Sequence, residues 1–211
     1  MEHIKSNNSS IELNDKVINI EEDTNSIEIE WNKLKDINKD IIGWIKIDDT
    51  NINYPILKDN NNLKYMNHSF EGSYNKNGAI FTLNNNPFKD KVTTIYGHNM
   101  KTNIMFSELG KYMNKEFLHK HSTFSIYTEN QECVAKVFSV YSIGVDTEEN
   151  NISSLDFKEE IEYYKKMSKY SVENIGEIKK IVKLSTCSYL NNHTTPTNQR
   201  YYIVANLEEL H

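Results

Sequence analysis

Short runs of alternating apolar and polar residues, separated by turn-forming residues, occupy most of the chain between residues 44 and 205. Such runs predict strands that are half-buried against a core. The expected strands are 44–47, 52–56, 78–83, 92–96, 124–127, 134–138, 180–184 and 201–205. Many short strands with few helices between them favour a closed β-barrel over a doubly wound parallel sheet. We therefore expect a mainly β protein with helices over the ends of a barrel.

Three segments have the three- and four-residue apolar spacing of amphipathic helices. They run from Ile27 to Ile41, from about Met105 to Leu118 and from about Leu155 to Tyr170. Residues 1–25 are rich in Asn, Ser, Asp and Glu and predict a polar leader that is flexible or helical. Residues 26–211 are expected to form a single domain, which is long enough to bury a core without a metal or disulfide.

Charge and hydropathy exclude several classes of function. The net charge is -6 and the basic residues are scattered, which argues against nucleic acid as a partner. No apolar run approaches the roughly 20 residues that cross a bilayer, so we expect membrane attachment only through an anchor absent from this chain. Paired-cysteine zinc spacing and a phosphate-binding glycine loop are also missing from the sequence.

The two cysteines have different surroundings. Cys133 lies in an apolar alternating run and is interpreted as a small buried hydrophobe. Cys187 ends a predicted strand among hydroxyl residues, in LSTCSY, where a rigid backbone would present a thiol to a groove. A nucleophilic thiolate needs a basic or cationic neighbour. Taken alone, a cysteine near a strand end is more often a buried hydrophobe than a nucleophile. We expect both thiols to be free.

His98 follows another predicted strand, in YGHNM at 96–100, and Gly97 is expected to supply a backbone conformation closed to other residues. An imidazole titrates near neutral pH and can accept and return a proton. Arg200 begins the last strand and is the only arginine in the chain. Its planar guanidinium suits an oxyanion or a peptide backbone, although a surface salt bridge is the ordinary alternative.

These motifs, in this order, closely resemble those of the sortases: YGHNM at 96–100, LSTCSY at 184–189, and Arg200 before a hydrophobic final strand. The resemblance covers roughly residues 30 to 207. Three further features are similar to class B sortases: GWIKI at 43–47 followed by Tyr54-Pro55, Met105-Phe106 with Leu109 and Tyr112, and a long helix before the cysteine strand.

The resemblance implies an eight-stranded sortase barrel in which residues 26–211 are the catalytic domain. It implies a transpeptidase that cleaves an Asn-Pro-x-Thr-like sorting signal after Thr, through a thioester on Cys187. His98 would move protons and Arg200 would hold the oxyanion. Ser185, Tyr189 and Asn99 are weaker candidates for substrate binding. No metal or organic cofactor is implied.

The partners implied are the sorting peptides of surface proteins and a peptidoglycan amine. The implied location is the outer face of the membrane of a Gram-positive bacterium. Two alternatives stay open: a papain-like cysteine hydrolase, which normally places the cysteine before the histidine and opens a helix with it, and a wall-binding barrel without activity.

Overall fold

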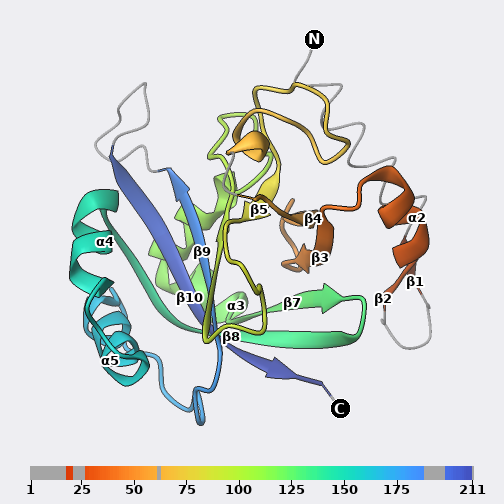
Figure 1. Cartoon of the computed structure of the whole chain (residues 1–211). Helices are drawn as coiled ribbons and strands as arrows, with labels where there is room; N and C mark the ends of the chain where they lie inside the picture. The colour runs from red at the N-terminus through yellow and green to blue at the C-terminus, as the bar shows by residue number, and fades with distance from the viewer. Residues whose placement is uncertain (1–17, 21–26, 61–62, 188–197, 211) are drawn as a thin grey trace.

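Eight strands of this chain form a closed barrel, as the sequence predicts (Figure 1). The computed structural model describes residues 18–20, 27–60, 63–187 and 198–210, and for residues 18–20 and 187 the backbone alone. The order around the barrel is β10-β8-β7-β3-β4-β5-β6-β9, with β9 returning to β10. The strands are β3 (Ile41–Lys46), β4 (Asn53–Lys58), β5 (Ile80–Thr82), β6 (Val92–Tyr96), β7 (Thr123–Thr128), β8 (Gln131–Gly144), β9 (Ile181–Cys187) and β10 (Gln199–Glu209).

Two of the strand pairings are parallel and the others in the barrel are antiparallel. β4 pairs with β5 in parallel, and β6 pairs with β9 in parallel from Val92↔Ile181 to Tyr96↔Ser185. Strand β9 also pairs with β10, antiparallel, from Arg200↔Cys187 to Asn206↔Ile181. The carboxyl ends of β6 and β9 therefore meet the amino end of β10 at one edge of the barrel.

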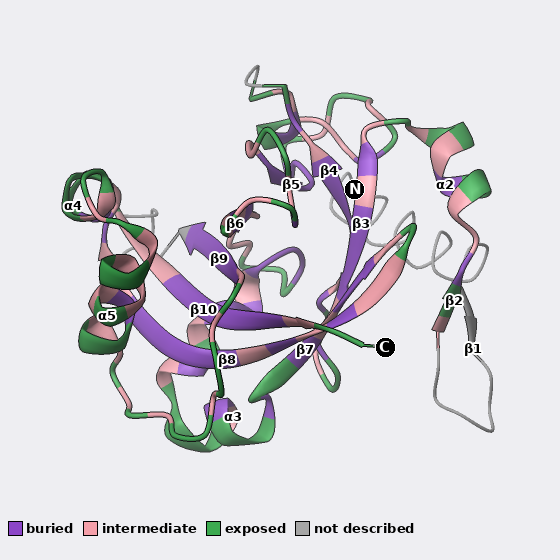
Figure 2. Ribbon diagram, turned by 60° about the horizontal axis from the view of Figure 1, so that its bottom comes forward, coloured by how far each residue is buried: buried purple, intermediate pink, exposed green. Residues whose placement is uncertain are grey.

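The barrel interior is filled by inward-facing aliphatic and aromatic side chains, and the strands are buried along most of their length (Figure 2). Successive side chains of a strand point to opposite faces, so each strand contributes some residues to the barrel interior and others to its outer surface. Val182 and Leu184 of β9 join the interior cluster, whereas Ile181 belongs to a second cluster on the outer face beneath the helices. The outer face of β9 is thus covered by the helices at Ile181, and its later residues Lys183 and Ser185 line a pocket.

The helices differ from their predicted bounds. The structure has α2 (Trp31–Ile37), the 3-10 helices η1 (Lys64–Met66) and η2 (Ser107–Met113), and α3 (Lys115–Lys120), α4 (Val145–Ile152) and α5 (Phe157–Met167). The predicted helix at 105–118 is divided, because Asn114 leaves the helical region and its side chain accepts hydrogen bonds from the backbone N–H groups of Glu116 and Phe117. Helix α4 was not predicted from the sequence.

The amino-terminal segment also departs from the prediction. The helix expected from Ile27 to Ile41 is confined to α2, because Ile27–Ile29 is a strand, β2, and Ile41 belongs to β3. Strand β1 (Ile18–Ile20) pairs antiparallel with β2, so these three residues of the predicted polar leader are extended and not helical. The rest of the leader lies outside the described residues.

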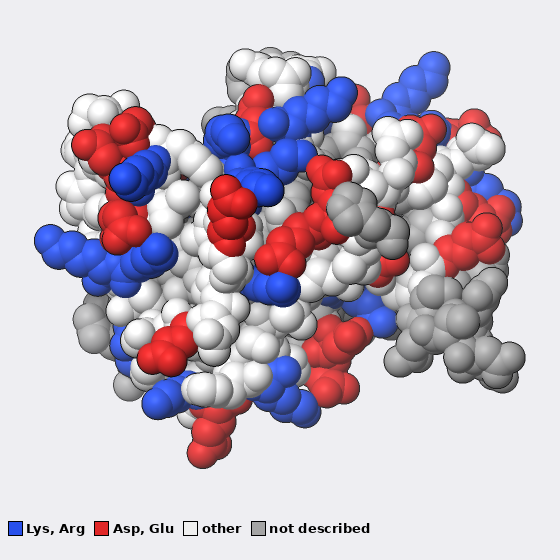
Figure 3. Space-filling view, turned by 90° about the horizontal axis from the view of Figure 1, so that it is seen from below, with Lys and Arg blue, Asp and Glu red and all other residues white. Residues whose placement is uncertain are grey.

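Two general features bear on partners. No helix in the described part of the chain is long and apolar enough to cross a membrane. On the face seen from below in Figure 3, Lys and Arg side chains are interspersed with Asp and Glu, so the net charge is not concentrated on that face.

Cys133 is the core residue that the sequence indicates. It is fully buried on β8 as a free thiol, and burial, followed by the charge of Glu209, raises its pKa. A thiol that is both buried and held neutral is a poor nucleophile.

We predict that Cys133→Ala lowers the free energy of unfolding by about 1 kcal/mol, since it removes a small buried group. The activity that the sequence predicts for Cys187 should stay at the wild-type rate per folded molecule. Denaturant unfolding and an activity assay on the same preparation measure both quantities, and a large rate loss in fully folded protein would contradict the assignment.

Candidate active site

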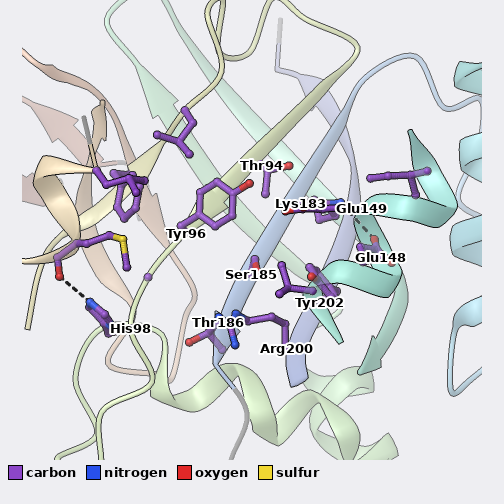
Figure 4. Close-up of a pocket in the computed structure, with 17 residues that line it drawn as sticks. Thr94, Tyr96, His98, Glu148, Glu149, Lys183, Ser185, Thr186, Arg200 and Tyr202 are labelled. Carbon is purple, nitrogen blue, oxygen red and sulfur yellow. Dashed lines mark hydrogen bonds and ion pairs between the residues drawn. The ribbon is translucent and has the colours of Figure 1, made fainter. Parts of the chain in front are cut away.

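A pocket of about 340 Å³ lies on the outer face of the barrel where β6, β9 and β10 meet. Its floor comes from alternate residues of these strands, including Thr94 and Tyr96 of β6 and Tyr202 of β10. One wall is the η1 region with Leu63 and Met66, and the opposite wall is α4 (Figure 4). The pocket is therefore a short groove over β6, β9 and β10, and Phe81 of the neighbouring strand β5 also lines it.

The outer face of β9 carries the cysteine. Lys183 and Ser185 line the pocket and are buried, and Cys187 follows them at the same two-residue spacing. Cys187 is consequently the last residue of β9, in register with the residues of this strand that line the pocket. The backbone of Cys187 pairs with that of Arg200 on β10. Since β9 lies between β6 and β10, the cysteine is placed between the strand that leads to His98 and the strand that carries Arg200.

His98 lines the pocket at the opposite side of β9 from Arg200 (Figure 4). Its backbone is fixed by Phe106, whose N–H donates to the His98 carbonyl at 2.9 Å. The His98 Nε2 atom lies 2.7 Å from the Met66 carbonyl oxygen. Because a carbonyl oxygen only accepts, Nε2 carries a proton in this arrangement and Nδ1 is the ring atom left to exchange one.

Gly97 has a different purpose from the one that the sequence suggested. The φ angle of Gly97 does not lie in the left-handed region. Among the described residues, the glycines with a positive φ are Gly72, Gly78 and Gly176. Instead, a Cβ at Gly97 would lie 2.4 Å from Cδ1 of Ile80 and 2.8 Å from Phe106. The Gly97 N–H also donates to the Ser185 carbonyl at 3.2 Å, which extends the β6–β9 pairing. Close approach of the chain, and not backbone conformation, requires glycine before His98.

Arg200 lines the pocket and is half-buried at the start of β10. Its Nη1 donates to the Gln199 carbonyl at 3.1 Å. In Figure 4 the side chain extends beside the end of β9, close to Thr186 in that view. The structure thus brings the side chains of His98 and Arg200 to one pocket, at the end of the strand that carries Cys187.

The weaker candidates divide. Ser185 lines the pocket. Asn99 is not among the residues that line it, and its backbone forms an isolated antiparallel β-bridge with Met105. Tyr189 is outside the described residues. Thr186, which sequence reasoning did not single out, lines the pocket with a buried hydroxyl that has no hydrogen-bond partner among the described residues. Its place beside Cys187 in the sequence was the available signal.

Acidic side chains belong to the α4 wall, among them Glu149. Burial, and then the charge of Glu149, raises the pKa of the Tyr96 hydroxyl, so this group stays a hydrogen-bond donor at neutral pH. Among the described residues no cluster of three or more His, Cys, Asp or Glu side chains could hold a metal ion. The absence of a cofactor stays a prediction.

Comparison with known proteins identifies the family. Residues 45–208 match the sortase domain. Sortase B of Listeria monocytogenes is 37% identical over 164 residues, which are 75% of this chain and 67% of that protein. Among solved structures, sortase B of Bacillus anthracis in complex with AAEK1 has a TM-score of 0.78 and 28% identity, with 100% of this chain and 99% of that chain covered. A Staphylococcus aureus sortase B–substrate complex has a TM-score of 0.73 and 29% identity, covering 85% of each chain.

The chain belongs to the sortase family. The three relatives are each described as sortase B, and the protein is accordingly a sortase B-like cysteine transpeptidase.

We predict that Gly97→Ala slows peptide cleavage by about 100-fold, because a methyl group in contact with Ile80 and Phe106 displaces the adjacent histidine. Overpacking of this kind also destabilises a fold by about 1 to 3 kcal/mol. Cleavage rates measured well below the melting temperature separate the two effects. Full activity in folded Gly97→Ala protein would contradict the close-packing explanation.

Proposed function

We propose that this sortase cleaves an Asn-Pro-x-Thr-like sorting signal after Thr and transfers the acyl product to a peptidoglycan amine. Cys187 is the nucleophile, His98 the proton carrier and Arg200 the cation that holds the oxyanion. One observation supports this assignment above the others: β9 lies between β6 and β10, and His98 and Arg200 line one pocket at the end of the strand whose last residue is Cys187.

The first half of the reaction forms the thioester. The Cys187 thiolate attacks the carbonyl carbon of the signal's Thr, and the negative charge moves to the carbonyl oxygen, where the Arg200 guanidinium stabilises it. As the tetrahedral intermediate collapses, the C–N bond breaks and protonated His98 gives its proton to the departing amine. With Nε2 bonded to the Met66 carbonyl, that proton comes from Nδ1.

The second half resolves the thioester. The acceptor amine attacks the thioester carbonyl, neutral His98 takes the amine proton, and the Cys187 thiolate leaves. Microscopic reversibility gives the histidine opposite roles in the two halves. The same Arg200 contact stabilises both tetrahedral intermediates, because the oxyanion occupies the same position each time.

The pocket has the form that an extended peptide needs. It runs along the outer face of three strands and its floor is built on rigid barrel backbone. The Staphylococcus aureus relative, with TM-score 0.73, was solved as a sortase B–substrate complex. The natural setting that fits this reaction is the outer face of the membrane of a Gram-positive bacterium, where sorting signals meet peptidoglycan amines.

We predict that the purified protein, incubated with an Asn-Pro-x-Thr-type peptide and hydroxylamine, forms the peptide hydroxamate. Hydroxylamine stands in for the natural amine and intercepts the thioester. Cys187→Ala abolishes the product, and His98→Ala slows its formation by about 100-fold or more, because proton transfer to the leaving amine is lost. Mass spectrometry of the products measures both.

The same assay contains its contradicting outcomes. Cleavage to the free acid at a rate unaffected by hydroxylamine would favour a cysteine hydrolase. Absence of any cleavage, together with peptide binding, would favour a wall-binding barrel. Cys133→Ala is the matched cysteine control, since its thiol lies in the core and its loss should leave hydroxamate formation intact.

We predict that Arg200→Lys lowers kcat by about 100-fold while KM changes little. Lysine keeps the charge and loses the planar set of donors, and an oxyanion exists only in the intermediates and transition states. Steady-state kinetics with the same peptide give the two constants. Wild-type kcat in the lysine variant would reduce Arg200 to a general source of positive charge.

A further inference from the structure

Helix α4 forms one wall of the pocket, and it contacts the outer apolar cluster of the barrel through Ile152 at its carboxyl end. Its sequence is VDTEENNI, and Glu148 is the one residue of the helix that is buried. Val145 and Ile152, at its two ends, are only partly buried. An eight-residue helix of this composition has little stability of its own. Beyond the contact of Ile152, its position must therefore come from the interactions of Glu148 and from contacts at its amino end.

Glu148 is held by three side chains from three different elements. Tyr141 of β8 donates to Oε1 at 2.6 Å and Tyr163 of α5 donates to Oε2 at 2.9 Å. The Lys183 ammonium of β9 lies 3.3 Å from Oε1. At the amino end of α4, Asn198 donates to the Asp146 carboxylate at 3.0 Å. The helix is thus tied to the barrel by polar contacts.

Lys183 is as completely enclosed as its partner. The side chains of Lys183 and Glu148 are 5% and 2% exposed. The ammonium lies 5.3 Å from the ring centroids of both Tyr164 and Tyr202, which supply cation–π contacts. Figure 4 shows the pair at the α4 side of the pocket, joined by a dashed line.

The tyrosines around the pair act as fixed donors. Burial, and then the charge of Glu148, raises the pKa values of Tyr141 and Tyr202, and burial raises that of Tyr163 to about 12. These hydroxyls stay protonated at neutral pH. A buried ion pair adds little to stability compared with well-packed apolar residues, but it imposes one arrangement on the elements that it joins. Here those elements are α4 and β9.

The pair lies at a defined depth in the pocket. Lys183 precedes Cys187 by four residues on β9, which is about 13 Å at about 3.3 Å per residue. In an extended peptide with its Thr at Cys187, the residue three positions upstream is about 10 Å away. The acyl part of the peptide is the part that the enzyme keeps through the thioester stage. A peptide that runs from Cys187 toward Lys183 along β9 would place its first signal residue in the pocket near α4.

We infer that the buried Lys183–Glu148 pair positions α4 as the wall that receives the first residue of the sorting signal. This inference rests on the proposed function. Both groups are positioning residues, because their hydrogen-bonding and cation–π contacts are to the protein. They act on the peptide through the neighbouring α4 residues Val145, Glu149 and Ile152, which line the pocket.

The test uses Lys183→Met, Glu148→Gln and the double variant. Each single variant should raise KM for the Asn-Pro-x-Thr peptide about tenfold with kcat within about twofold, and the double variant should resemble the singles because the two residues act as one unit. The double variant removes both buried charges and so stays folded even if a single variant does not. Thermal melting reports the fold of each.

The readout that separates positioning from general destabilisation is a change in the peptide. Replacing the first signal residue, Asn, by Ala should raise KM in the wild type, and this penalty should largely disappear in the double variant. Lys180→Met is the matched control. It breaks an exposed ion pair with Glu209, at 2.9 Å, just before the same strand, and should leave both constants unchanged.

The outcomes are distinct. No hydroxamate from the wild-type protein would remove the proposed function itself. If the wild-type protein is active and the folded double variant has an unchanged KM, the inference about α4 is wrong and the proposed function stands. The inference is also wrong if the double variant loses kcat equally with the Asn and the Ala peptide, because that pattern indicates damage to the reacting groups and not to the α4 wall.

Discussion

The parallel pairing of β6 with β9 is the contact on which the rest of the site depends. It closes the barrel between two halves of the chain and sets the ends of both strands at one edge. The Gly97 N–H continues the pairing by one hydrogen bond beyond the strand, which carries the alignment up to His98. The antiparallel partner of β9 then contributes Arg200 opposite Cys187. Strand register thus sets the backbone of Cys187 opposite that of Arg200 and aligns the end of β6 with the end of β9.

The two sides of the pocket are built on different principles. The floor is barrel backbone, where inward-facing residues such as Leu184 hold each strand through the core. The α4 wall instead depends on one carboxylate, Glu148, and its donors. Apolar packing tolerates small shifts because it has no direction, whereas hydrogen bonds and a buried ion pair fail when they are displaced. A wall held in this way has one position, which the proposed recognition of a sorting signal would require.

Short apolar runs bounded by turn residues were enough to predict the barrel strands. In β6 the burial alternates along the strand, whereas β4 and β5 are buried almost throughout because both of their faces are covered. The sequence could not predict α4, because its only apolar residues are seven positions apart and its single buried residue is a glutamate. Tertiary contacts decide that helix. The motifs around His98, Cys187 and Arg200 were visible in the sequence, but the reason for Gly97 was not. Its neighbours Ile80 and Phe106 come from other parts of the chain, and only the fold brings them within contact distance.

The choice of cation at two positions follows from the same geometry. Every basic residue except Arg200 is a lysine, so the chain uses arginine only where a flat guanidinium faces the end of the cysteine strand. At Lys183 the space between two tyrosine rings and one carboxylate suits a compact ammonium, which makes a single ion pair and presents its remaining surface to the rings. A guanidinium there would bring more donors than the cluster has acceptors. In the proposed mechanism the two cations thus differ in kind, because Arg200 meets a charge that appears during the reaction, whereas Lys183 neutralises the buried charge of Glu148.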